Sequence, residues 1–188
     1  MSATLPDPVA IATVLLLLSA VTGGIDVVLI HLVVLRLHSR PETFYEHQLH
    51  TVHAAMAVVA VTLLFLVNLG GLGLWLATAV VLGWFAVEVA DMLAEKNSRA
   101  TLGGLPSYEY ALHLVTSGLR FAFIALMLAA KPTAAWSLSA PTLLAEPHPM
   151  WVRAATLLVI VPGVLIVAVH LWLMRPEFRM SAVPAAHP

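Results

Sequence analysis

The chain has no cysteine among its 188 residues. Disulfide bonds, thiolate metal ligands, iron–sulfur clusters and thioether-linked haem are therefore excluded. Charged residues are also scarce, at 10% of the chain, whereas ordinary soluble domains carry about 25%. With a formal net charge of -1, the chain lacks the basic surface that binds phosphate backbones, so we expect no nucleic-acid partner.

Hydrophobic residues instead make up 61% of the chain, and its mean hydropathy is +0.95. A helix that crosses a bilayer needs roughly 20 mostly apolar residues. Five stretches meet this requirement: residues 9–37, 44–69, 72–95, 108–130 and 150–174. The segments between them are too short for a soluble domain. We therefore expect an all-α integral membrane protein, with one domain over residues 1–188 and the lipid bilayer as its surroundings.

The first apolar stretch has the length of a retained helix rather than of a cleaved signal peptide. No lysine or arginine precedes it, and its apolar run continues past Gly23 and Gly24. We therefore count it as the first of five transmembrane helices.

Lysine and arginine are distributed unequally between the two ends of the predicted helices. One side carries Arg36, Arg40, Lys96, Arg99, Arg175 and Arg179, and the other carries Lys131 and Arg153. Because loops rich in basic residues stay in the cytoplasm, this bias predicts an outside N-terminus and a cytoplasmic C-terminus. We expect the membrane to be a bacterial inner (cell) membrane.

Ionisable residues are numerous inside the predicted spans, although each costs at least ~2.5–3.5 kcal/mol on insertion scales and is a functional candidate by default. Helical periodicity gathers most of them into one stripe per helix. The stripes are Glu46, His50 and His53; Glu88, Asp91 and Glu95; and Glu109, His113 and Arg120. Counted from the predicted cytoplasmic ends at ~1.5 Å per residue, the stripes meet at one depth in the inner half of the membrane.

The first span contributes Asp26 and His31. These residues are five positions apart, which corresponds to about 140° around an α-helix. We therefore expect only Asp26 to point inward, with His31 as an alternate ligand.

A short motif occurs twice, as Tyr45-Glu46-x-x-Leu49-His50 and as Tyr108-Glu109-x-x-Leu112-His113. Asp26 precedes the first copy at nearly the same distance at which Glu88 precedes the second. The first four spans are therefore predicted to be two pseudo-repeated hairpins that form a four-helix bundle, with the fifth helix packed beside it.

This set of residues resembles the site of carboxylate-bridged di-metal four-helix bundles, in which two helices give one Glu each and two give Glu-x-x-His. The spacing here is Glu-x-x-x-His, and Asp26 stands in place of one Glu. The resemblance implies a divalent transition metal, Fe, Mn or Zn, because mixed imidazole and carboxylate ligands suit these ions. The predicted ligands are Asp26, Glu46, His50, Glu88, Glu109 and His113, with His31, His53, Asp91 and Glu95 as alternates or orienting partners.

Charge supports this interpretation, because desolvated carboxylates must be paired, protonated or bound to a cation. Arg120 is the only basic residue in the predicted stripes, where it could hold a ligand carboxylate or bind an anionic substrate. Two divalent ions rather than one would offset much of the acidity. Iron or manganese would suggest an oxidoreductase for a lipophilic small molecule, and zinc would suggest a hydrolase.

Three other interpretations stay open. A b-type haem electron carrier could use His50 or His53 opposite His113, or His31 with His170, as axial ligands. A proton-coupled carrier or a proton or ion conduit could be built from the same buried acids and histidines, and a carrier with so few helices would need to form a homodimer. In a purely structural interpretation, the groups nearest the helix ends simply reach water.

Overall fold

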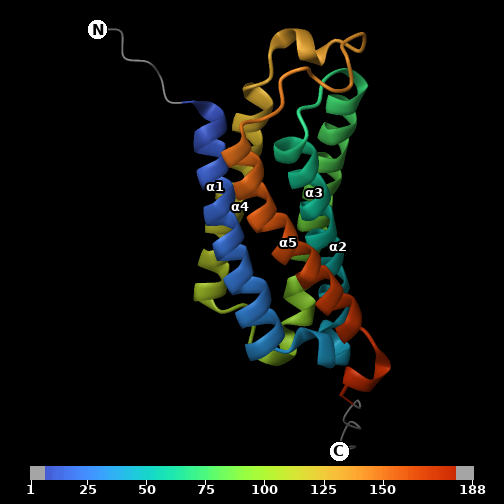
Figure 1. Ribbon diagram of the computed structural model, residues 1–188. Coiled ribbons are helices and arrows are strands. Elements are labelled where there is room, and N and C mark those ends of the chain that lie inside the picture. Colours follow the sequence, from blue (N-terminus) through green and yellow to red (C-terminus); the bar gives the residue numbers. More distant parts are fainter. Residues whose placement is uncertain (1–6, 181–188) are drawn as a thin grey trace, which may run out of the picture.

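The computed structural model describes residues 7–180, and every regular element within that range is a helix (Figure 1). The five long helices are α1 (Pro8–Gly24), α2 (Phe44–Val61), α3 (Gly71–Ser98), α4 (Ser107–Ala129) and α5 (Met150–Leu173). Two of them are extended by π-helices, η1 (Ile25–Val34) after α1 and η4 (Thr62–Leu66) after α2. The predicted all-helical class is therefore confirmed for the described residues.

Each of the five predicted spans corresponds to a helix that is long and apolar enough to cross a membrane. These segments are Pro8–Val34, Pro41–Leu66, Gly71–Ser98, Ser107–Ala129 and Met150–Leu173. Large apolar side chains lie on their outer faces, and Leu82, Leu114 and Leu158 are 62%, 67% and 72% exposed. Such faces suit contact with lipid tails. Insertion into a membrane and the two repeated hairpins stay predictions.

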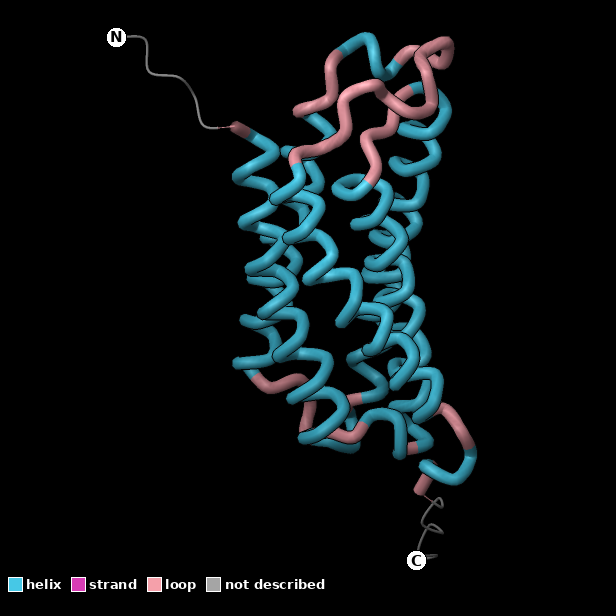
Figure 2. Tube along the Cα trace, viewed as in Figure 1, coloured by secondary structure: helices cyan, strands magenta, loops and turns pink. Residues whose placement is uncertain are grey.

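The helices lie side by side, with their connections gathered at the two ends (Figure 2). The main contacts join α1 to α4 and α2 to α3, and α5 packs against both α1 and α2. The apolar core includes Leu16, Leu64, Phe65 and Phe123, and many of the buried polar residues belong to η1, the start of α2 and the end of α3. The fold thus separates an apolar half from a polar half.

Helix α1 begins with a cap and continues into a wider helix. Asp7 accepts a hydrogen bond from the N–H of Val9 at 2.9 Å. Pro8, in the first turn, has no N–H group and so leaves no donor without an acceptor. Within and after η1, bonding follows the i→i+5 pattern, as in the 2.8 Å bond from the Leu35 N–H to the Ile30 carbonyl. The segment ends at Arg36, whose φ of 53° is left-handed.

The π-helix corrects the expectation that Asp26 and His31 point in different directions. In a helix with i→i+5 bonding, residues five apart lie about one turn apart and share a face. His31 Nε2 accordingly lies 3.4 Å from Asp26 Oδ1. The 140° separation applies only to α-helical geometry, which this segment does not have.

The opposite end of the molecule is closed by the connection between α4 and α5. The N–H of Gly70 donates to the carbonyl of Thr142 at 3.0 Å, and the N–H of Leu144 donates to the carbonyl of Asn68 at 2.9 Å. Lys131 Nζ donates to Asn68 Oδ1 at 2.6 Å, and its burial lowers the pKa of this amine to about 8. This end therefore holds its own polar contacts, apart from those of the carboxylates and histidines.

Candidate metal centre

Buried acids, histidines and one arginine meet where α2 and α4 begin, where α3 ends and along η1. We call this set the carboxylate–histidine cluster; its members are Asp26, His31, Glu46, His50, Asp91, Glu95, Arg99, Glu109 and His113. All are buried except His113, which is partly buried. Of the predicted acids and histidines, the structure brings these eight together, whereas Glu88 and His53 lie apart from them.

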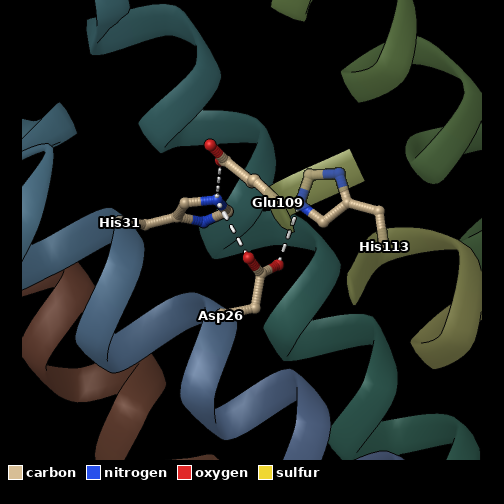
Figure 3. A group of neighbouring side chains, drawn as sticks. All are labelled: Asp26, His31, Glu109 and His113. Atoms are coloured by element: carbon tan, nitrogen blue, oxygen red, sulfur yellow. Dashed lines mark hydrogen bonds and ion pairs between the residues drawn. The ribbon is translucent and has the colours of Figure 1, made fainter. Parts of the chain in front are cut away.

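Four of these residues form the tightest group, in which each side chain points toward the others (Figure 3). His31 Nε2 lies 2.9 Å from Glu109 Oε1, and Asp26 Oδ2 lies 3.0 Å from His113 Nε2. One donor atom from each residue lies within 4.8 Å of the others. Two imidazoles and two carboxylates at such spacing could hold a metal ion.

The hydrogen bonding of this four-residue group is incomplete. Asp26 Oδ1, His31 Nδ1, Glu109 Oε2 and His113 Nε2 are buried and make no hydrogen bond of good geometry within the described protein, although Asp26 Oδ1 and His113 Nε2 lie 3.4 Å and 3.0 Å from ion-pair partners. A buried polar group left unsatisfied costs about 1–3 kcal/mol. A cation bound among these donor atoms would remove part of that cost.

A second, three-residue group shares His31 with the first. It consists of His31, Glu46 and His50, and His50 Nε2 lies 3.4 Å from Glu46 Oε1. The rings of His31 and His50 are 4.3 Å apart between centroids. The two groups are therefore parts of one cluster rather than separate sites.

Helix α3 provides a carboxylate behind each motif histidine. His50 Nδ1 lies 3.3 Å from Asp91 Oδ2, and His113 Nδ1 lies 3.3 Å from Glu95 Oε1. In metal sites, a carboxylate that accepts from the outer ring nitrogen fixes the tautomer and leaves the other nitrogen free for the ion. Asp91 and Glu95 have the positions that such orienting partners need.

Arg99 is the residue of the cluster that the sequence analysis assigned to a cytoplasmic loop. The predicted third span stops at residue 95, but α3 continues through Ser98 and turns Arg99 inward. Arg99 is 1% exposed, and its Nη2 lies 2.6 Å from Glu46 Oε1 and 2.7 Å from Glu109 Oε1. A single guanidinium thus joins the glutamates of the two repeated motifs.

Glu88, His53 and Arg120 do not join the cluster. Arg120 Nη1 lies 3.0 Å from Glu88 Oε2, and the same nitrogen donates to His53 Nε2. Ser117 donates to the other oxygen of Glu88, and the guanidinium lies over the Trp84 ring at 4.9 Å. These residues form a separate polar layer, one or two turns nearer the apolar core.

His170, expected opposite His31 in the haem interpretation, packs elsewhere. Its ring is stacked on that of His47, with centroids 4.7 Å apart and planes 9° from parallel. Its Nδ1 lies 3.3 Å from Thr51 Oγ1, and His47 Nε2 lies 3.2 Å from its carbonyl oxygen. The stacked rings of His47 and His170 therefore contribute to the packing of α5 against α2 and are not part of the cluster.

The position of the inward acid on α3 also differs from the sequence interpretation. The repeat pairs Asp26 with Glu88. In the structure, however, Asp91 contacts the motif histidine of α2, His50, in the way that Asp26 contacts the motif histidine of α4, His113.

Comparison with family models, with curated proteins and with solved structures found no match for this chain.

Proposed function

We propose that this is a membrane-embedded metalloprotein in which Asp26, His31, Glu109 and His113 bind one divalent transition-metal ion. The observation that carries the proposal is that one possible ligand atom from each of two imidazoles and two carboxylates lies within 4.8 Å of the others. Each of the four residues also has a buried atom without a hydrogen bond of good geometry. Mixed nitrogen and oxygen ligands suit Fe, Mn or Zn better than Ca or Mg. The hydrophobic surroundings would keep bulk water from the ion.

One ion fits this charge distribution better than two. The second group uses His31 again, and Arg99 already brings a fixed positive charge to Glu46 and Glu109. A second divalent ion between the same glutamates would be repelled by that guanidinium. Arg99 therefore takes the electrostatic role of the second ion of a di-metal bundle, which revises the expectation of two ions.

The reaction class that we propose is metal-dependent chemistry on a lipophilic small molecule. Iron or manganese would supply oxidation chemistry, and zinc would supply an activated water for hydrolysis. Asp26, His31, Glu109 and His113 would hold the ion, and Glu95 orients the imidazole of His113.

The haem alternative has less support from this geometry. Two axial imidazoles must face each other across the plane of a porphyrin. His170 instead stacks on His47 rather than facing His31, and both ring nitrogens of His50 and of His113 lie within 3.4 Å of carboxylate oxygens.

A proton conduit is the second candidate, and one observation favours it. His50 and His113 each have both ring nitrogens within 3.4 Å of a carboxylate oxygen, on different helices or turns. An imidazole between two acids can receive a proton on one side and release it on the other. In this function the cluster would work without a metal ion.

Elemental analysis of detergent-purified protein tests the choice. We expect about one equivalent of Fe, Mn or Zn per chain, and loss of the ion in His31→Ala and His113→Ala. His53→Ala and Glu88→Gln are matched controls, because these residues lie in the separate layer and should leave the metal content unchanged. Metal-free protein of full thermal stability that conducts protons in liposomes would overturn the metal proposal in favour of the conduit.

A further inference from the structure

A cavity of about 380 Å³ lies between α1, α2 and α5, toward the apolar side of the cluster. Its volume is within the range of small-molecule sites. Most of its wall is apolar, and two wall residues, Val21 on α1 and Leu158 on α5, are 62% and 72% exposed on the outer faces of their helices. The cavity is therefore open on the side that would face lipid.

Small residues make the room for this cavity. Gly23 and Gly24 line it from the end of α1, Ala54 and Ala57 from α2, and Gly163 from α5. A methyl group added at Gly24 would meet no atom within 4 Å. The space results from the choice of side chains, since the neighbouring turns of the same helices carry leucine, valine and isoleucine.

The polar end of the cavity is formed by His53, Trp84, Thr116 and Arg120. Arg120 donates to His53 Nε2, and because a guanidinium only donates, His53 must carry its proton on Nδ1. Nδ1 has no hydrogen-bond partner among the residues described. Trp84 Nε1 and Thr116 Oγ1 are also without a partner.

The charge of this end is already balanced. Glu88 lies 3.0 Å from Arg120, so the guanidinium offers no net positive charge to a ligand. An anionic headgroup would bring an uncompensated charge into an apolar cavity, at a high cost. A neutral oxygen acceptor would find unused N–H and O–H donors there.

We propose that this cavity binds a neutral lipophile whose carbonyl or hydroxyl oxygen accepts a hydrogen bond from His53, with its hydrocarbon part between α1, α2 and α5. Lipid alcohols, esters and quinones share this chemistry. The anionic substrate that the sequence suggested for Arg120 does not fit a guanidinium paired with Glu88.

The cavity also adjoins the candidate metal centre. Gly23, His53 and Thr116 on its wall each lie three residues from a cluster member, namely Asp26, His50 and His113. Three residues are slightly less than one turn of an α-helix, a rise of about 4.5 Å. The claim that the bound oxygen is the reacting group rests on the proposed metal function. The claim that the cavity binds the lipophile is independent of it.

Photocrosslinking tests the binding separately from the chemistry. Protein in lipid nanodiscs is labelled with hexadecanol carrying a diazirine near its headgroup, and with the matched hexadecanoate at a pH where the acid is ionised. We expect saturable labelling of the cavity wall by the alcohol, about tenfold stronger than by the carboxylate, a difference of about 1.4 kcal/mol. Unlabelled hexadecanol and a decyl-substituted benzoquinone, added as competitors, distinguish the two sources of the oxygen.

Gly24→Leu supplies the decisive variant, because it fills the cavity from a helical position with open space and improves helix propensity. Gly118→Leu is its control: this glycine also meets nothing within 4 Å, and it does not line the cavity. We expect labelling to fall about tenfold in Gly24→Leu and to stay unchanged in Gly118→Leu.

Any one of four results overturns the proposal. The labelling does not saturate, it persists in Gly24→Leu, it favours the carboxylate, or neither competitor reduces it. The same measurement on metal-free His113→Ala separates the two proposals. Retained labelling there shows a binding site whether or not the cluster holds an ion, and a metal-loaded protein without labelling refutes only the cavity ligand.

Discussion

The Nη2 atom of Arg99 lies 2.6 Å from Oε1 of Glu46, 53 residues earlier in the chain, with both side chains at most 1% exposed. The same nitrogen reaches Glu109. An ion pair this deeply buried is weak evidence for net stability, because desolvation opposes the attraction, but removal of one partner leaves a charge uncompensated. The cluster therefore depends on Arg99 whether or not a metal ion is bound.

Arg99→Gln should destabilise the metal-free protein by about 3–5 kcal/mol, the typical cost of breaking a buried pair. Added Zn²⁺ or Mn²⁺ should restore part of the loss, because a second divalent ion could then reach Glu46 and Glu109. Thermal unfolding in detergent, with and without metal, measures both effects. Arg175→Gln removes an exposed pair with Glu177 and should change stability by less than about 1 kcal/mol. Equal effects of the two substitutions would show that Arg99 is not part of the cluster's charge balance.

Glu95→Gln should weaken metal binding about 10–100-fold without abolishing it, because it removes the acid behind the proposed ligand His113 but no ligand itself. Asp91→Asn should have a smaller effect, because Asp91 contacts His50, which is not one of the four proposed ligands. Competition with a coloured chelator measures the affinity. Glu88→Gln serves as the control on the same helix face, since its carboxylate contacts Arg120 and Ser117 instead. If Glu95→Gln binds metal as tightly as Glu88→Gln, the orienting role assigned to Glu95 is wrong.

Periodicity and composition were sufficient to predict the five helices and the level at which the acids and histidines meet. Hydropathy finds long apolar segments directly, and the i, i+4 spacing of Glu46 with His50 and of Glu109 with His113 places each pair on one face. These predictions depend only on α-helical geometry, which α2 and α4 have.

The parts that the sequence analysis missed depend on departures from that geometry or on the end of a helix. His31 belongs to the four-residue group only because η1 is a π-helix. No residue pattern in this segment predicts a π-helix rather than an α-helix. Arg99 follows the predicted end of its span, so it was counted with the loop residues that orient the chain. The signal for it in the sequence is its position four residues after Glu95, about one helical turn beyond the acidic stripe.

His170→Ala should weaken the attachment of α5 without emptying the proposed metal site, because α5 contributes no residue to the cluster. The substitution removes the stacked partner of His47 and leaves Thr51 Oγ1 without its second contact, at a cost of about 1–3 kcal/mol. Thermal unfolding and elemental analysis of the same sample test the two halves of the expectation. Loss of metal from well-folded His170→Ala protein would contradict the separation of this pair from the site.

Lys131 should make stability depend on pH at the other end of the molecule. Burial lowers the pKa of its amine from the ordinary 10.5 to about 8, so the folded protein binds fewer protons than the unfolded chain between these values. Stability should then rise as the pH increases from about 8 to 10.5, since the cost of burying the charge is full below this window and absent above it. Melting temperatures across this range should rise in the native chain relative to Lys131→Gln. Parallel curves for the two proteins would contradict the shift.

Orientation in the membrane can be measured cleanly, because the chain has no cysteine to compete with an introduced one. Burial of Arg99 removes one cation from the predicted cytoplasmic side, but Arg36, Lys96 and Arg175 are exposed there, so the bias keeps its sign. A membrane-impermeant maleimide added to intact cells should therefore label Ser139→Cys, in the connection before α5, and spare Asn97→Cys, near the end of α3. Both positions are exposed, and both variants should react once the cells are opened. The reverse pattern in intact cells would place the carboxylate–histidine cluster in the outer half of the membrane instead of the inner half.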